Sequence, residues 1–301
     1  IFRKFALSVI FMVFNDDTTF QVASILGIVF INFVLQVRYM PYMGIREKAV
    51  VIRQEAEESK EQSKFMKNPL DDFILFQEDY KSALSNLFAH KLSGEGFLPY
   101  SDLISIAGDT LENNKKILEY SVRDISAFFQ RDPACTKYME PFLFYKGFIA
   151  LQAYRIARDR YLSGEIELGK FIQMRVSELF GVDLHPNADI GSGLMIDHAH
   201  SIVVGATAVI GQDVSMLHSV TLGGTGKETG DRHPKIGNGV LLGAGCSILG
   251  NISIGYCSKV ASGSVVLDNV PPCKTVAGVP AKIVGESGCE NPSHEMDHSI
   301  P

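Results

Sequence analysis

Apolar residues recur at every sixth position through the C-terminal half of the chain. This period fits neither an α-helix, with 3.6 residues per turn, nor a flat strand, with a period of two. It is typical of a parallel β-helix in which each side of a triangular coil takes six residues, and the thin coils bury their apolar side chains by stacking. The predicted interior positions are Leu184, Ile190, Ile196, Ile202, Ala208, Val214, Val220, Ile236, Leu242, Ile248, Ile254, Val260 and Val266.

The repeat is interrupted once, between Val220 and Ile236, where sixteen residues stand in place of twelve. The inserted stretch 223–233 is glycine-rich and polar, so we predict a loop that leaves the β-helix, and long loops are usually functional. Glycines that directly follow repeat positions are expected to form corners with positive φ. They are Gly191, Gly237, Gly243 and Gly255.

Helical spacing replaces the six-residue period in the preceding part of the chain. After Pro69, apolar residues recur every three or four positions, as on one face of a helix. We predict an α-helical domain over residues 70–181, with helices at 70–91, 101–107, 110–129, 141–162 and 169–180. Residues 46–69 are dense in charge and are predicted to form a solvated helical linker, while residues 286–301 are predicted to form a flexible C-terminal tail.

The first 45 residues are mostly apolar, with long apolar runs at 5–14 and 20–37. Basic residues precede the first run and follow the second, which suits a membrane hairpin with both ends in the cytosol. Membrane anchoring through residues 5–37 is therefore one expectation, with a cytoplasmic catalytic domain. The alternatives are a buried helical pair or an unrelated upstream segment, since neither run clearly reaches the length of about 20 residues that a spanning helix needs.

Composition excludes several classes of protein. The net charge of −6, without an arginine-rich tract, gives no electrostatic footprint for nucleic acid. The five cysteines are odd in number and form no CxxC pair, so we expect reduced thiols and neither a disulfide framework nor a zinc site.

Polar residues able to do chemistry concentrate in the predicted coils and their inserted loop: Asp183, His185, Asp197, His198, His200, His218, Arg232 and His233. With coils of about 18 residues, His218 lies one coil after His198, and Asp183 nearly one coil before it. An imidazole beside a carboxylate is the minimal general base, because the carboxylate fixes the tautomer and stabilises the imidazolium.

Long ordered motifs in both halves of the chain resemble the serine O-acetyltransferase family. In the coils they are Asp183-Leu-His-Pro-Asn-Ala, Met195-Ile-Asp-His-Ala, Val203-Val-Gly-Ala-Thr-Ala-Val-Ile, Val220-Thr-Leu-Gly-Gly-Thr-Gly-Lys and Gly230-Asp-Arg-His-Pro-Lys-Ile. In the helical half they are Ala83-Leu-Ser-Asn-Leu-Phe-Ala-His-Lys-Leu-Ser, Arg131-Asp-Pro-Ala and Tyr145-Lys-Gly-Phe-Ile-Ala-Leu-Gln-Ala-Tyr-Arg. The resemblance covers residues 70–285 and implies an α+β chain: an N-terminal α-helical domain followed by a left-handed parallel β-helix, residues 182–285, of hexapeptide repeats.

The resemblance also implies an activity and a set of site residues. The reaction would transfer acetyl from acetyl-CoA to the hydroxyl of L-serine, giving O-acetyl-L-serine for cysteine biosynthesis, without a metal. His198 would be the general base and Asp183 would orient it. The serine site would contain Asp132, Asp197, Arg232, His233 and Gly224, and the acetyl-CoA site would contain Thr225, Ala244, Lys259 and Ser262.

Partners are implied by the same resemblance. They are L-cysteine as a feedback inhibitor, further copies of the chain in a trimer or hexamer, and O-acetylserine sulfhydrylase, which would bind a C-terminal isoleucine. Here Ile300 is followed by Pro301, which displaces the terminal carboxylate by one residue.

Three alternative functions are compatible with a β-helix. The first is a hexapeptide-repeat acetyltransferase acting on another small hydroxyl acceptor. The second is a zinc β-helix carbonic anhydrase with His198, His218 and His233 as ligands. The third is a non-catalytic scaffold on a membrane anchor.

Overall fold

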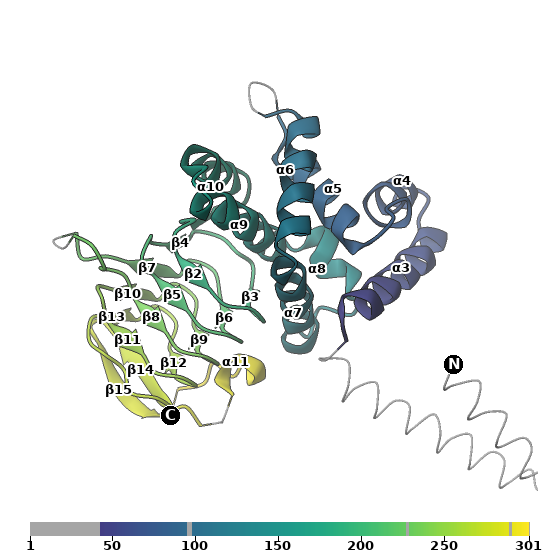
Figure 1. The fold of residues 1–301 in the computed structure, drawn as a ribbon. Helices are drawn as coiled ribbons and strands as arrows, with labels where there is room; N and C mark the ends of the chain where they lie inside the picture. The colour runs from purple at the N-terminus through teal and green to yellow at the C-terminus, as the bar shows by residue number, and fades with distance from the viewer. Residues whose placement is uncertain (1–42, 95–97, 227–228, 289–290, 301) are drawn as a thin grey trace, which may run out of the picture. The chain divides into compact units, whose positions relative to one another are not determined.

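The computed structural model describes residues 43–94, 98–226, 229–288 and 291–300 (Figure 1). Helices fill the first part of this range and short strands the second, as the change of period predicts. The helices are α3 (Ile45–Gln62), α4 (Lys67–Leu70), the π-helix η2 (Asp71–Leu75), α5 (Tyr80–Leu92), α6 (Tyr100–Asn113), α7 (Lys116–Arg131), α8 (Met139–Phe144), α9 (Lys146–Leu162) and α10 (Ile166–Phe180).

The charged segment that we expected to be a solvated linker contains α3, and α3 packs against η2, α7 and α8. Its buried residues are Lys48, Ile52 and Ala56. The ammonium of Lys48 lies 3.6 Å from the centroid of the Tyr138 ring, and burial lowers the pKa of Lys48 to about 8. This docking could not be predicted from the sequence, because two of the three buried residues of α3 are a lysine and an alanine and so form no apolar stripe.

The strands form three sheets that together make a left-handed parallel β-helix. One face of the β-helix is β1 (Val182–Leu184), β4 (Ile202–Val204), β7 (Thr221–Gly223), β10 (Ser247–Leu249) and β13 (Val265–Val266). The second face is β2 (Asp189–Ile190), β5 (Val209–Ile210), β8 (Lys235–Ile236) and β11 (Ser253–Ile254). The third face is β3 (Met195–Ile196), β6 (Ser215–Met216), β9 (Leu241–Leu242), β12 (Lys259–Val260), β14 (Lys274–Gly278) and β15 (Ala281–Glu286).

The six-residue repeat describes the interior of the β-helix correctly. All thirteen predicted positions are buried, and none is more than 5% exposed. They belong to one apolar core that continues into the helices through Leu151, Ile156 and Val176. The stacking of coils therefore buries the side chains that a single coil would leave in water.

Four glycines that were predicted to have positive φ serve a different purpose. Gly191, Gly237, Gly243 and Gly255 are absent from the positive-φ residues of the described chain. A Cβ at each of these positions would come closer than 3.0 Å to the backbone of the next coil. They are glycines because neighbouring coils approach closely at these corners, so the prediction of positive φ was wrong.

A buried ion pair connects the helices to the β-helix. The carboxylate of Asp124, on α7, is fully buried and lies 2.7 Å from Nη2 of Arg155 on α9. Its other oxygen accepts a hydrogen bond of 3.0 Å from the backbone N–H of Leu194, directly before β3. Arg155 in turn donates to the carbonyl of Gly191 at 2.8 Å. These bonds fix α7 and α9 against the first coil.

The C-terminal segment that was expected to be a flexible tail contains the short helix α11 (Pro292–Glu295), which contacts α7 and β9. Pro292 and Ser293 are buried there. The four cysteines in the described residues are all free thiols. No helix among those residues has the length and apolar character required to span a bilayer. The apolar stretch 5–37, for which anchoring was predicted, lies outside the described residues.

Candidate active site

The predicted base lies at the corner between β3 and β4, residues 197–201, which we call the base corner. The side chain of His198 is 70% exposed, and its Nε2 lies 3.4 Å from Oδ2 of Asp197. The ring of His198 meets that of His218, one coil further, edge to face with centroids 5.8 Å apart. This corner therefore presents an accessible imidazole that is already paired with a carboxylate.

The backbone of the base corner has an unusual conformation. Three of its residues, His198, Ala199 and Ser201, have positive φ without being glycine, a combination that side chains disfavour. The corner is held from below by α9, where a Cβ on Gly147 would overlap the carbonyl oxygen of Ile196. Helix α9 thus packs backbone to backbone against the strand that leads into His198.

Two predicted acetyl-CoA residues continue the same row along the β-helix. The backbone N–H of Gly245 donates to the carbonyl of His218, and that of Gly263 donates to the carbonyl of Ala244. Ala244 and Ser262 therefore stack above His198 and His218, in the third and fourth corners of the row. The two corners that follow His198 and His218 in this row are therefore occupied by small residues.

Arg232 and His233 lie at a different corner, formed by the inserted loop 224–234 between β7 and β8, which we call the arginine corner. His233 is buried against Gly205, where no side chain could be accommodated. Its Nδ1 lies 2.8 Å from Oγ1 of Thr207, and the same oxygen accepts the N–H of Arg232. Thr207, which we did not predict, holds both residues, and its position one coil before the loop is the only sequence signal for it.

The arginine corner is a basic environment. Burial and the nearby Arg232 lower the pKa of His233. Burial also lowers the pKa of His185, which lies at the same corner two coils earlier, with Lys170 and Arg232 acting in the same direction and Asp183 opposing them. Gly224 lies against the Arg232 side chain, and Thr225 follows it. An anion such as a carboxylate would be stabilised at this corner.

Asp183, the predicted partner of His198, lies on the outer side of β1 and pairs in register with Val203. Its Oδ1 accepts a hydrogen bond of 2.6 Å from Gln173 of α10. Within the described residues of a single chain, no hydrogen bond or ion pair joins Asp183 to His198. Asp183 and His198 are fifteen residues apart in the sequence, whereas Asp183 and Val203, which stack directly, are twenty apart. Asp183 and His198 therefore occupy different sides of the coil.

The remaining predicted residues are distributed over the fold. Asp132 caps the C-terminal end of α7, where its Oδ1 accepts the N–H of Ala134. Lys259 is buried, and its Nζ donates to the carbonyls of Asp297 and Ser299 in the C-terminal segment. Lys259 is therefore held by this segment, apart from the row formed by Ala244 and Ser262.

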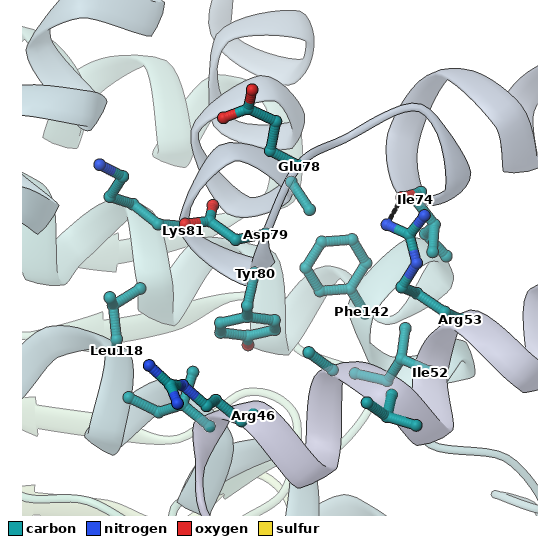
Figure 2. Close-up of a pocket in the computed structure, with 14 residues that line it drawn as sticks. Arg46, Ile52, Arg53, Ile74, Glu78, Asp79, Tyr80, Lys81, Leu118 and Phe142 are labelled. Carbon is teal, nitrogen blue, oxygen red and sulfur yellow. Dashed lines mark hydrogen bonds between the residues drawn. The ribbon is translucent and has the colours of Figure 1, made fainter.

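Two further features bear on the alternative functions. Among the described residues, no three histidine, cysteine or acidic side chains are gathered as a metal site would require. A hollow of about 530 Å³ lies among the helices and is lined mainly by apolar side chains, including Ile52, Ile74 and Phe142 (Figure 2). None of the predicted site residues lines this pocket.

Comparison with known proteins identifies the family. The family model "Serine acetyltransferase, N-terminal" matches residues 50–153. The serine acetyltransferase of Salmonella typhimurium is 50% identical over 224 residues, which cover 74% of this chain and 82% of the relative.

Solved serine acetyltransferases share the fold. A complex with cysteine has a TM-score of 0.83 at 42% identity, covering 85% of this chain and 99% of that one. A Brucella abortus complex with coenzyme A has a TM-score of 0.78 at 46% identity, covering 81% and 97%. A soybean complex with serine has a TM-score of 0.78 at 42% identity, covering 80% and 98%. The chain therefore belongs to the serine acetyltransferase family of acyltransferases.

Proposed function

We propose that this chain transfers the acetyl group of acetyl-CoA to the hydroxyl of L-serine. The observation that supports this most strongly is the pairing of two kinds of corner: an exposed imidazole beside a carboxylate, and a basic corner able to bind a carboxylate. Serine is a zwitterion with a nucleophilic hydroxyl, so its site needs a base and both signs of charge. Relatives have been solved in complex with serine and with coenzyme A, which agrees with this substrate pair.

His198 takes the hydroxyl proton while the serine oxygen attacks the thioester carbonyl. In the described chain the carboxylate that can stabilise the resulting imidazolium is Asp197, 3.4 Å from Nε2. The tetrahedral oxyanion then collapses and expels the CoA thiolate, without a covalent enzyme intermediate. The imidazolium can return its proton to the thiolate, which restores the base for the next cycle.

The site is proposed to form between two copies of the chain. His198 and Arg232 lie at two different corners of one β-helix, separated by the face that contains β1, β4 and β7. A trimer of parallel β-helices brings the base corner of one copy to the arginine corner of the next, where Asp183 could also reach His198. The row formed by Ala244 and Ser262 would then line the groove for the pantetheine arm, with Thr225 on the opposite wall.

The amino-acid end of the substrate uses both corners in this arrangement. Arg232, with its planar fork, binds the carboxylate together with His233. Asp132 and Asp197 bind the ammonium, and the backbone of Gly224 borders the pocket. L-cysteine differs from L-serine only in having a sulfur atom in place of the hydroxyl oxygen, so it is proposed to bind at the same place as a feedback inhibitor. One relative has been solved in complex with cysteine.

We also propose an assembly and a location for this chain. The trimer would pair through the helical domains into a hexamer, and the Ile300 segment would bind O-acetylserine sulfhydrylase, with Pro301 weakening that contact. The catalytic domain is proposed to be cytoplasmic, with anchoring through residues 5–37.

The deciding experiment measures thiol release from acetyl-CoA by the purified chain, with serine, homoserine and a small sugar offered side by side. We expect release only with serine, and we expect His198→Ala to abolish it without changing the oligomer size. Equal rates with a sugar would favour the alternative acceptor, and full activity of His198→Ala would remove His198 as the base.

A further inference from the structure

Arg131, the last residue of α7, is anchored in the β-helix by an unusually buried guanidinium. Its side chain is 1% exposed. Nη1 donates to Oγ of Ser215 at 3.1 Å and to the carbonyl of Val214 at 3.5 Å, and Nη2 lies 3.5 Å from Oδ1 of Asp213. The Nε of Arg131 has no hydrogen-bond partner among the described residues. A buried cation with one donor unpaired depends strongly on each acceptor that it has.

The remaining acceptor comes from the other end of the chain. Nη2 of Arg131 lies 3.0 Å from Nε2 of His294, in α11. Since an arginine can only donate, His294 accepts this hydrogen bond through a neutral ring nitrogen. A second bond fixes α11 at the same place, because Oγ of Ser215 donates to the carbonyl of Ser293 at 2.7 Å. Figure 1 shows α11 beside β9.

This anchor lies next to the proposed ammonium site. Asp132 directly follows Arg131 and caps α7. Ser215 belongs to β6, and the next residue of that strand, Met216, accepts the N–H of Asp197 at 2.8 Å. Both proposed ammonium ligands, Asp132 and Asp197, are thus positioned from strand β6, one of them through the side chain of Arg131.

We propose that His294 is a positioning residue for the amino-acid substrate. By holding the Arg131 guanidinium against β6, it fixes the turn at Asp132 at the distance from Asp197 that an ammonium group requires. The C-terminal segment thereby sets the affinity for serine without touching the substrate. This inference rests on the proposed function, since it concerns the same serine site.

Because His294 acts as a hydrogen-bond acceptor, substitutions that keep an acceptor at this position should differ in effect from those that remove it. His294→Ala removes the acceptor, whereas His294→Gln keeps one, because the amide oxygen of glutamine can accept from a guanidinium. His298 provides a matched control in the same segment, since its side chain is exposed and forms no hydrogen bond within the described residues. His294 is itself an exposed residue, so none of these substitutions threatens the core.

The test compares the full-length wild type, His294→Ala, His294→Gln and His298→Ala in the thiol-release assay, with oligomer size checked for each. We expect His294→Ala to raise the KM for serine about three- to tenfold, the effect of losing one charged hydrogen bond at a distance. Its KM for acetyl-CoA and its kcat should stay within about twofold of wild type, since neither is proposed to depend on Asp132, the ammonium ligand that Arg131 positions. His294→Gln should restore the KM for serine, and His298→Ala should match wild type.

Four results would overturn the inference. If the wild type releases thiol only with serine but His294→Ala has an unchanged KM for serine, the positioning role is excluded and the proposed function stands. Equal rises in both KM values, or a glutamine variant as impaired as the alanine variant, would indicate a general structural effect. A wild type without serine-dependent thiol release would refute the proposed function, and this inference with it.

Discussion

Gly147 on α9 lies against the backbone of Ile196 so closely that a Cβ would overlap the Ile196 carbonyl oxygen. Ile196 is the last residue of β3, and Asp197 and His198 follow it. The helical domain therefore contacts the proposed base corner through main-chain atoms, with no side chain that could move aside.

Gly147→Ala should displace this corner. We expect a loss of kcat of at least about tenfold, together with a loss of stability of about 1–3 kcal/mol from overpacking. Gly108→Ala is the matched control, because a Cβ at Gly108 on α6 meets nothing within 4 Å and alanine favours the helix. Steady-state kinetics and thermal melts of both variants check this, and normal kinetics for Gly147→Ala would show that the corner tolerates the shift.

Arg232→Ala should selectively weaken the amino-acid substrate. A charged hydrogen bond to a carboxylate contributes about 1.5–3 kcal/mol, so the KM for serine should rise about tenfold to hundredfold. Lysine cannot donate the paired hydrogen bonds of a guanidinium, so the KM for serine of Arg232→Lys should lie between those of Arg232→Ala and the wild type. Arg46→Ala, at an exposed position on α3, should have no effect. A parallel rise in the KM for acetyl-CoA would argue against the carboxylate contact.

Stability should decrease as the pH falls below about 6.5, the value at which an unfolded histidine titrates. The pKa of His233 is lowered in the folded chain by burial and by Arg232, so unfolding takes up a proton in the window between the two values. The stabilisation is complete above that window and is lost as the pH falls through it. Thermal melts from about pH 7.5 to about pH 5.5 should show this loss, and His233→Asn should reduce the slope. An identical slope in the variant would exclude His233 as a contributor.

Asp124→Asn should destabilise the joint between the helices and the first coil. The variant leaves the buried Arg155 without its charge partner, and breaking such a pair costs about 3–5 kcal/mol. Asp109→Asn, on the exposed side of α6, should change the melting temperature little. Chemical denaturation of the two variants measures the difference, and a small effect at Asp124 would mean that water compensates for the lost charge.

The thirteen repeat positions inside the β-helix could be predicted because their period is local: apart from the break between Val220 and Ile236, each is six residues from the next. The reason why glycine occupies position 191 and the equivalent corners could not be predicted, because the backbone atoms that a Cβ would meet there belong to the next coil. The docking of α3 was missed because Lys48 is buried over an aromatic ring, a contact with a residue 90 positions away.

The candidate site was predicted less completely than the fold. Periodicity shows that His198 and His218 share a corner, and the rings do meet. It does not show whether Asp183 reaches His198, because within one chain Asp183 accepts a hydrogen bond from Gln173 and a contact between copies leaves no period in the sequence. The roles of Asp124 and His294 depend on contacts between distant segments, for which a single sequence carries no signal. Thr207 is indicated only by its position one coil before the loop.

The placement of His198 and Arg232 at separate corners has a genetic consequence. In the proposed trimer, at serine concentrations far below the raised KM, the variants His198→Ala and Arg232→Ala should both be nearly inactive, and each retains the corner that the other lacks. Refolded or expressed together, they should form mixed trimers that contain some intact sites and regain activity that neither has alone. Such complementation between defective alleles would not occur if every copy of the chain carried a complete, self-sufficient catalytic centre.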